Sequence, residues 1–303
     1  MIYVTIVFLL MVFAIGGQIQ RDIPLEKLTG PFSDEDSKFF LWNGVQIHYK
    51  DEGKGEPIVL LHGSSSSLHT WDGLTKMLKS DFRIVRVDLI GFGLTGPNPK
   101  QDYSLEMYMD FINSFADHLG LPSFTIVGNS WGGMLAWNFA AQNPQRISSM
   151  VLINSAGLKM KTVPTRFKLV KTSMGRWILK NTMSKWMVKK GIKEVYHQPS
   201  KIDSELVERY QSLTLREGNR KAFVDIVLAR KLPDINKLLK INVPTLILWG
   251  RYDLLYPLKQ ARRFKELLAK SQLKIIENTG HVPMEEAPLA CGREIKTFIK
   301  SLQ

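Results

Sequence analysis

The segment that most constrains this chain is GNSWGG, residues 128–133. It follows the apolar, β-type run FTIV (residues 124–127) and leads into the helix-type run MLAW (residues 134–137). A strand that turns sharply into a helix at a serine holds that side chain exposed, ready to attack. The flanking glycines leave room for a strained backbone where a Cβ would clash. The pattern therefore predicts that Ser130 is a nucleophile at a strand-to-helix turn.

Short apolar strands alternate with helices over most of the chain. Asn43-Gly44 lies between two β-type runs and predicts a hairpin. The alternation of strands and helices predicts an α/β fold with a mainly parallel eight-stranded sheet and helices on both faces. The expected strands are residues 39–42, 45–49, 58–61, 83–87, 124–127, 150–153, 245–249 and 274–276.

One segment, residues 158–235, departs from this alternation. It is helical in pattern, basic and without a clear strand. We expect it to form a helical lid inserted between two strands of the core, and we call it the cap. The core is then made of residues 21–157 and 236–303, preceded by an N-terminal segment (1–20), with a polar linker from Gln18 to about Lys38.

The net charge of +13 is concentrated in the cap. Between Leu158 and Lys201 the only acidic residue is Glu194. A local charge of this kind favours an anionic partner at one surface and argues against a general nucleic-acid-binding protein. The basic residues of this stretch are Lys159, Lys161, Arg166, Lys168, Lys171, Arg176, Lys180, Lys185, Lys189, Lys190, Lys193 and Lys201.

The N-terminal stretch Met1–Ile15 is uncharged and almost wholly apolar. A cleaved secretory signal normally carries Lys or Arg ahead of its apolar core, and this one offers only the α-amine. The run is shorter than the ~20 residues that comfortably span a bilayer. We expect a single-pass membrane anchor, with a cleaved signal and a secreted or periplasmic product as the alternative.

Cofactors and metals are not expected. The single cysteine, Cys291, cannot form an internal disulfide. The sequence has no CxxC pair, no His/Cys cluster with metal-ligand spacing and no phosphate-binding glycine loop of the Walker type.

A serine nucleophile needs a base and an acid that orients the base. His281 follows a late strand on a loop before the last helix, and Asp253 follows the strand at 245–249. An acid at the end of the preceding strand is ruled out, because Asn154 and Ser155 stand there. The order Ser130, Asp253, His281 is one of the three common orders of such triads. His197, in the cap, remains open as a substrate contact.

Five motifs fall in one order: HGSSSS from His62, DLIGFG from Asp88, GNSWGG, WGRYD, and GHVPMEE from Gly280. In this order the chain resembles the α/β-hydrolase superfamily from about Phe39 to its C-terminus. The resemblance implies an oxyanion hole made of the backbone N–H groups of Ser64 and Trp131. It also implies that His62 braces the loop that carries Ser64.

The same resemblance narrows the chemistry. Epoxide hydrolases and haloalkane dehalogenases of similar layout use an aspartate where this chain has Ser130. Carbon–carbon bond hydrolases share the Gly-Asn-Ser-x-Gly-Gly turn. However, they typically have a tryptophan directly after the catalytic histidine, where this chain has Val282. Their oxyanion loop also differs from the Ser64–Ser67 sequence of this chain. Ester hydrolysis is the favoured prediction. A carbon–carbon bond hydrolase and a slow-turnover ligand receptor are the alternatives.

The cap sequence bears on where the enzyme works. Apolar residues recur at helical spacing with lysines between them, as in a helix that lies on an anionic membrane surface. The alternative is that the apolar stripe packs on the core above the active site. The layout is similar to that of membrane-bound monoacylglycerol lipases, which predicts a lipid-directed ester hydrolase. The stripe consists of Phe167, Val170, Met174, Trp177, Ile178, Leu179, Met183, Trp186 and Met187.

Overall fold

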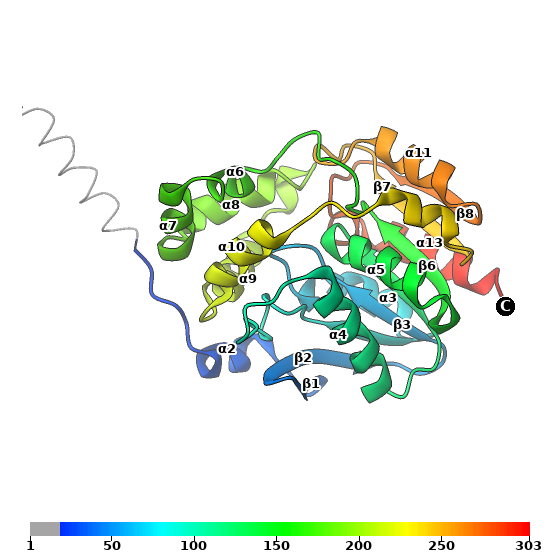
Figure 1. Cartoon of the computed structure of the whole chain (residues 1–303), viewed down its shortest axis with the longest axis horizontal. Coiled ribbons are helices and arrows are strands. Elements are labelled where there is room, and N and C mark those ends of the chain that lie inside the picture. Colours follow the sequence, from blue (N-terminus) through cyan, green and yellow to red (C-terminus); the bar gives the residue numbers. More distant parts are fainter. Residues whose placement is uncertain (1–18) are drawn as a thin grey trace, which may run out of the picture.

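The computed structural model describes residues 19–303, and their main element is an eight-stranded sheet (Figure 1). The strand order is β1-β2-β4-β3-β5-β6-β7-β8. β2 pairs antiparallel with β1 and β4, and all other neighbours are parallel. The expected mainly parallel eight-stranded α/β sheet is confirmed. The strands are β1 (Ser37–Trp42), β2 (Val45–Glu52), β3 (Pro57–Leu61), β4 (Arg83–Val87), β5 (Phe124–Asn129), β6 (Ile147–Ile153), β7 (Thr245–Gly250) and β8 (Ser271–Ile276).

Helices cover both faces of the sheet, which explains why its central strands are continuously apolar. Neighbouring residues of β5 show the two faces: Ile126 belongs to the apolar cluster that includes α4, α5 and α11, whereas Val127 belongs to the cluster of α3 and α13. The sheet thus separates two buried layers. The helices of the core are α3 (Asp72–Leu78), α4 (Leu105–His118), α5 (Trp131–Gln142), α11 (Leu258–Leu267), α12 (Pro283–Glu286) and α13 (Pro288–Lys300), with 3-10 turns at Leu68–Trp71, Pro144–Arg146 and Ile235–Lys240.

The chain between β6 and β7 builds a separate helical layer, beside the core in Figure 1. The basic apolar stripe is divided among three short helices there, because Thr172 and Ser184 cap new helix starts by accepting hydrogen bonds from Gly175 N (3.0 Å) and Met187 N (3.3 Å). The helices of this layer are α6 (Thr165–Leu169), α7 (Ser173–Asn181), α8 (Lys185–Lys193), α9 (Ser204–Leu215) and α10 (Asn219–Ala229), with a 3-10 turn at Pro199–Lys201.

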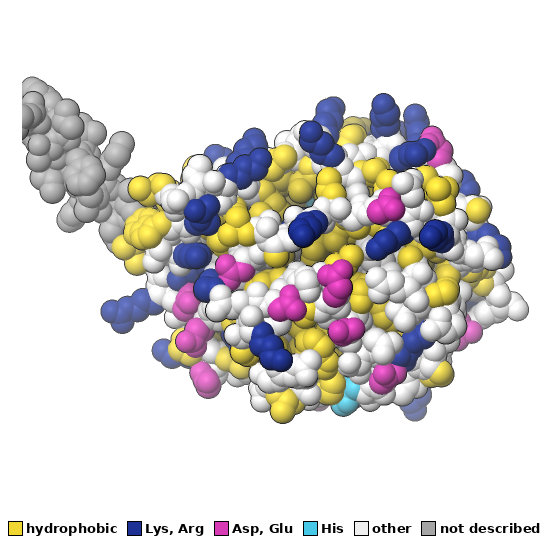
Figure 2. All heavy atoms as spheres, in the orientation of Figure 1, with side chains coloured by type: hydrophobic (Ala, Val, Ile, Leu, Met, Phe, Trp, Pro, Cys, Tyr) yellow, Lys and Arg dark blue, Asp and Glu magenta, His cyan; other side chains and the backbone are white. Residues whose placement is uncertain are grey.

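The stripe is split between the interior and the surface. Phe167, Val170 and Leu179 are buried, while Trp177 and Trp186 are exposed, the latter by 70%. Figure 2 shows Lys and Arg side chains along the edge formed by α6 to α8 and α11, with most Asp and Glu below them. Some residues of the stripe therefore pack in the interior, and others lie on the surface of the cap.

The described part of the expected polar linker contains a helix and pairs with the cap. Ile19 forms a β-bridge with Thr182 of the cap, and Ile23 forms one with Arg216. Between the cap and the sheet edge lies the helix α2 (Leu25–Phe32), whose Leu28 packs in a small buried cluster with core and cap leucines. Apolar burial and backbone pairing therefore fix this segment across the junction of the two layers.

The apolar N-terminal run Met1–Ile15, expected to be an anchor or a signal, lies outside the described residues. Within residues 19–303 we find no helix whose length and apolar character suit a membrane crossing.

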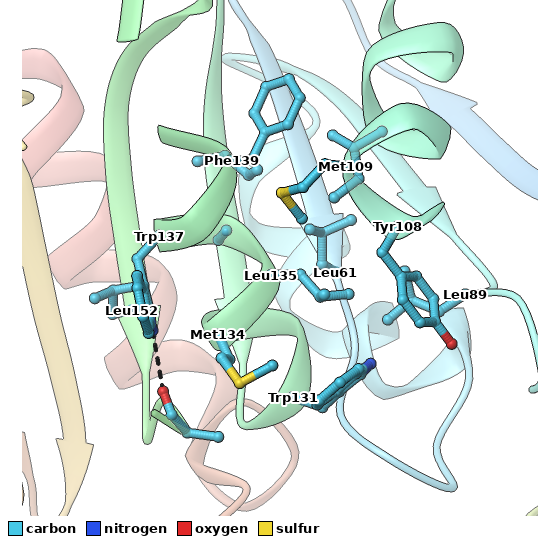
Figure 3. Close-up of a cluster of buried hydrophobic side chains, with 14 of the residues drawn as sticks. Leu61, Leu89, Tyr108, Met109, Trp131, Met134, Leu135, Trp137, Phe139 and Leu152 are labelled. Atoms are coloured by element: carbon cyan, nitrogen blue, oxygen red, sulfur yellow. Dashed lines mark hydrogen bonds between the residues drawn. The ribbon is translucent and has the colours of Figure 1, made fainter. Parts of the chain in front are cut away.

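Helix α5, which begins directly after Ser130, is buried on nearly all sides (Figure 3). Its tryptophan and methionine side chains pack between strand residues such as Leu61 and Leu152 and the α4 residue Tyr108. Trp137 Nε1 also donates a hydrogen bond to Ala156 O (3.1 Å) after β6. This packing fixes the helix that begins at the candidate nucleophile.

Candidate active site

The turn between β5 and α5 holds Ser130 in a strained conformation, with φ 53° and ψ −114°. A non-glycine residue with positive φ is uncommon and costs on the order of 1–3 kcal/mol. The close approach needs glycine around it: a Cβ on Gly128 would lie 2.3 Å from Gly132 O, and one on Gly132 would lie 2.0 Å from Leu61 O. The sequence GNSWGG folds into the sharp turn expected of it.

The backbone of Ser130 is fixed, whereas its hydroxyl is free. Ser130 N donates to Ile153 O (3.1 Å), and Ala156 N donates to Ser130 O (2.9 Å). The hydrogen bonds of residues 19–303 include none to the Ser130 hydroxyl, a frequent state of a nucleophile when no substrate is bound.

The two residues expected to supply the oxyanion hole lie near Ser130, one next to it in the chain and one in the same cavity wall. Trp131 N is the first amide of α5, at the positive end of the helix, and Ser64 lines the same cavity as Ser130. Neither N–H donates to another group within the described chain. Both are available for the role that the family resemblance implies.

The structure brings Asp253 and His281 together: His281 Nδ1 lies 2.8 Å from Asp253 Oδ2. Asp253 is 4% exposed, and its other oxygen accepts hydrogen bonds from the amides of Leu255 (2.8 Å) and Tyr256 (3.1 Å). A carboxylate held in this way keeps the proton of the imidazole on Nδ1. His281 Nε2 is then the basic atom, and the ring lines the cavity that contains Ser130.

Asn154 also holds the acid, a role that our sequence analysis missed. Its Nδ2 donates to Asp253 Oδ2 (2.7 Å), and its Oδ1 accepts from Gly250 N (3.0 Å). In the sequence, this position stands out only because it lacks a carboxylate. A polar residue at the carboxyl end of β6, next to β7, was the signal that pointed to it.

Asn129 is a second missed contributor. Its side-chain amide donates to Ile153 O (3.1 Å) and to His281 O (3.1 Å). It therefore ties the strand that carries Ser130 to the loop that carries His281.

His62 braces the oxyanion loop, as the resemblance implied. Its Nδ1 donates to Gly63 O (2.7 Å), and its Nε2 accepts from Leu89 N (2.9 Å). Burial lowers the pKa of His62, which keeps the ring neutral and suited to accept that bond.

Asp88 organises the neighbouring turn and does not line the cavity of Ser130. It accepts hydrogen bonds from Leu68 N (2.7 Å), Leu94 N (2.8 Å) and His48 Nδ1 (2.7 Å). Burial alone would raise the pKa of Asp88, but the hydrogen bond and charge of His48 outweigh it and lower the pKa to about 2.

The two glutamates of GHVPMEE join the cap to the core. Glu286 accepts from Gly280 N (2.6 Å), His197 N (2.8 Å) and Gln198 N (2.9 Å), and burial raises its pKa. Glu285 has a larger set of partners, all from the cap except Thr70. These partners are Thr70 Oγ1, Tyr196 OH (2.7 Å), Arg209 Nη2 (2.9 Å) and Tyr210 OH (2.6 Å).

Two cavities meet at the junction of core and cap. The first, about 50 Å³, contains Ser64, Ser130 and His281 in its wall. The second, about 260 Å³, lies among cap helices and is lined mostly by apolar side chains. Three cap residues line both: Arg166, Val195 and Tyr210.

Some candidate residues lie elsewhere. His197 stacks on Tyr252 at 4.0 Å, and both side chains are exposed, away from the cavity of Ser130. Tyr256, in contrast, is buried and lines that cavity. Within residues 19–303 no group of three or more His, Cys, Asp or Glu is placed to hold a metal ion.

The chain matches the model of the alpha/beta hydrolase fold family over residues 56–288. It is 28% identical over 265 residues to the uncharacterized hydrolase YugF of Bacillus subtilis, covering 86% of this chain and 97% of that protein. It is 28% identical over 285 residues to the monoacylglycerol lipase abhd6-B of Xenopus laevis, covering 86% and 84%.

Among solved structures, a meta-cleavage product hydrolase from Pseudomonas fluorescens IP01 superposes with a TM-score of 0.77 at 26% identity, covering 88% of this chain and 98% of that one. With the family model matching most of the chain, this protein belongs to the alpha/beta hydrolase fold family and is a hydrolase.

Proposed function

We propose that this protein is a serine hydrolase that cleaves carboxylic esters of lipids or acyl groups. The observation that carries the proposal is that His281, paired with Asp253 at 2.8 Å, lines the same cavity as the strained Ser130. The nucleophile, its base and the acid that orients the base come from three different loops.

In the first half-reaction, Ser130 Oγ attacks the ester carbonyl carbon while His281 Nε2 takes the hydroxyl proton. The amides of Ser64 and Trp131 donate to the oxyanion, a stabilisation that is often the largest single contribution to such catalysis. The tetrahedral intermediate then breaks its bond to the alcohol, which leaves with the proton from His281. An acyl-enzyme on Ser130 remains.

In the second half-reaction, water loses a proton to His281 and attacks the acyl carbon. The proton returns to Ser130 as the carboxylic acid leaves. Asp253 stays ionised throughout and stabilises the imidazolium in both steps. Every lone pair of that carboxylate has a hydrogen-bond partner. The four partners are Asn154, the backbone amides of Leu255 and Tyr256, and His281.

The apolar cavity of the cap supports a lipid or acyl substrate. Its walls are shared with the cavity of Ser130, so an acyl chain fits next to the scissile bond. Hydrolysis of a carbon–carbon bond is the second candidate, because a meta-cleavage product hydrolase is among the similar structures.

Two surface observations support work at a membrane with anionic lipids. Met174, Trp177 and Trp186 expose large apolar side chains on α7 and α8, among exposed lysines. Ile19, the first described residue after the apolar N-terminal run, pairs with Thr182 between those helices. Aromatic and basic residues together are typical of segments that lie on membranes.

A fluorophosphonate probe tests the chemistry. We expect it to label the wild type once, and Ser130→Ala to lose both the labelling and at least about 1,000-fold of esterase activity. Undiminished labelling of Ser130→Ala would contradict the assignment of Ser130 as the nucleophile.

A substrate panel separates the two candidate reactions. p-Nitrophenyl and glycerol esters of rising chain length report ester hydrolysis, and a vinylogous 1,5-diketone of the meta-cleavage type reports carbon–carbon hydrolysis. Faster turnover of the diketone than of every ester would favour the second candidate. Tight binding with slow turnover of all substrates would instead indicate a receptor.

A further inference from the structure

One cap residue at the junction of the two cavities has no partner. Arg166, in the first turn of α6, lines both the cavity of Ser130 and the apolar cavity of the cap. Its Nε is buried and has no hydrogen-bond partner, and its guanidinium forms no ion pair within residues 19–303. The residue as a whole is half-buried. A charge that is partly withdrawn from water without a partner is costly, so such groups are usually paired.

The packing around Arg166 orients it without using its donors. Its guanidinium carbon lies 5.8 Å from the ring centre of Phe167 and 5.7 Å from that of Phe223. These faces offer cation–π attraction but accept no strong hydrogen bond. Burial lowers the pKa of Arg166, and the charge of Glu194 only partly opposes this.

The nearest acids are engaged elsewhere. Glu194 accepts hydrogen bonds from the backbone and hydroxyl of Thr165, and it lies too far from Arg166 for an ion pair. Asp253 is occupied by His281 and three other donors. In contrast, Arg209 is paired with Glu285 and Arg220 with Asp22.

A second guanidinium adds to the positive potential. Arg230 lines the cavity of Ser130 and lies 4.6 Å from the ring centre of Trp131. Among the described residues, the walls of this cavity therefore carry two guanidinium groups and no carboxylate.

We propose that Arg166 binds an anionic group of the substrate, a carboxylate or a phosphate, within a few bonds of the scissile ester. A guanidinium suits both groups because its planar fork donates two parallel hydrogen bonds. The ester lies at Ser130, the anion at Arg166, and the alkyl chain continues into the cap cavity. The inference rests on the proposed ester hydrolysis and adds the substrate class.

Matched pairs of esters test this specificity. For the carboxylate, p-nitrophenyl hydrogen glutarate is compared with p-nitrophenyl pentanoate; for the phosphate, 1-octanoylglycerol 3-phosphate is compared with 1-octanoylglycerol. We expect Arg166→Gln to lower kcat/KM about 10- to 100-fold on the preferred anionic ester, mainly by raising KM. The neutral partner changes less than about 3-fold, since a charge-assisted hydrogen bond contributes nothing to it.

Two further variants complete the design. Arg166→Lys keeps the positive charge but cannot donate two parallel hydrogen bonds. We expect it to recover part of the kcat/KM that Arg166→Gln loses on the anionic ester. Arg263→Gln removes an exposed arginine paired with Glu266 and leaves both esters unaffected. A loss in only one anionic series identifies the anion as carboxylate or phosphate. An equal loss on charged and neutral esters assigns Arg166 a structural role and overturns the proposal.

Binding to an inactive variant separates this inference from the proposed reaction. Calorimetry on full-chain Ser130→Ala measures affinity for 1-octanoylglycerol 3-phosphate, 1-octanoylglycerol and glutarate without turnover. Tighter binding of a charged ligand that is lost on adding Arg166→Gln supports the anion site even if no ester is hydrolysed. Equal affinity for all three ligands, unchanged by Arg166→Gln, overturns it.

Discussion

The core and the cap of this protein handle polar groups in opposite ways. In the core, Asp253, Asn154 and Asn129 use their hydrogen-bonding groups on one another, on His281 and on strand ends. In the cap, Arg166 faces a cavity without a partner, and lysines and tryptophans cover the outside.

This difference assigns separate tasks to the two layers. Satisfied buried polar networks are rigid, and catalytic groups need such fixed positions. Groups without partners retain the capacity to bind a ligand. We infer that the core performs the reaction and that the cap selects the substrate and the surface.

Glu285 connects the two layers, and its substitution should have the largest effect on stability. Glu285→Gln leaves Arg209 without its carboxylate and weakens the bonds to two cap tyrosines. We expect a loss of about 3 kcal/mol in the free energy of unfolding, because removing one member of a largely buried ion pair leaves the other unpaired. Urea unfolding measures it, and limited proteolysis should show earlier cleavage in α8 and α9.

Glu266→Gln, which breaks an exposed pair, is the control and should change stability by less than about 0.5 kcal/mol. Equal stability of Glu285→Gln and the wild type would show that apolar packing alone holds the cap.

Asn154→Ala tests whether the rigidity of the core serves catalysis. The change removes one hydrogen bond to Asp253 and one to Gly250, so the acid and the imidazole lose orientation. We expect kcat to fall about 10- to 100-fold, on the order of 2 kcal/mol, with KM little changed. Steady-state kinetics on a p-nitrophenyl ester measure kcat and KM separately. Asn143→Ala, at the end of α5, is the control. A rise in KM with constant kcat would contradict the assigned role.

Asp88 gives the core a stability that depends on pH. Its folded-state pKa of about 2 lies below the ordinary value of 3.8, so the stabilisation is present above about pH 4 and is lost as the pH falls toward 2. Asp88→Asn should therefore cost roughly 2 kcal/mol at pH 7, and the difference from wild type should shrink in acid. Urea unfolding at several pH values measures this difference. Asp117→Asn, at an exposed pair with Arg146, should show almost none.

The smallest effect per residue is expected at the cap surface. Lys189 and Lys193 are exposed on α8, and each lysine near an anionic membrane contributes about 1 kcal/mol of binding. Lys189→Gln/Lys193→Gln should weaken binding to phosphatidylserine vesicles about 30-fold at low salt and leave hydrolysis of a soluble ester unchanged. A chain that begins at Ile19 isolates this surface from the apolar N-terminal run.

Lys240→Gln/Lys270→Gln, on the core, is the matched control with the same change of charge. Equal weakening by both pairs would indicate a response to net charge and would remove the cap surface from the proposal.

The sheet and the nucleophile turn could be predicted because their signals are local. Each strand is a short apolar run, and the turn at Ser130 needs glycine at fixed positions where backbone atoms meet. The roles of Asn154, Asn129 and Glu285 could not be predicted, because each depends on a partner about 25 to 150 residues away in the sequence. The contacts of the linker could not be predicted for the same reason, because polar composition does not reveal the two bridges of Ile19 and Ile23 to the cap.

By itself, the sequence determined the order of elements, the α/β class and the three residues proposed for catalysis. These follow from hydrophobic periodicity and from residue types with few alternative uses. Only the tertiary structure decided which polar groups are satisfied and which are free. Whether a polar group has a partner depends on what lies near it in three dimensions. Arg209 is paired with Glu285, whereas Arg166 lines the cavity of Ser130 without an ion-pair partner among the described residues.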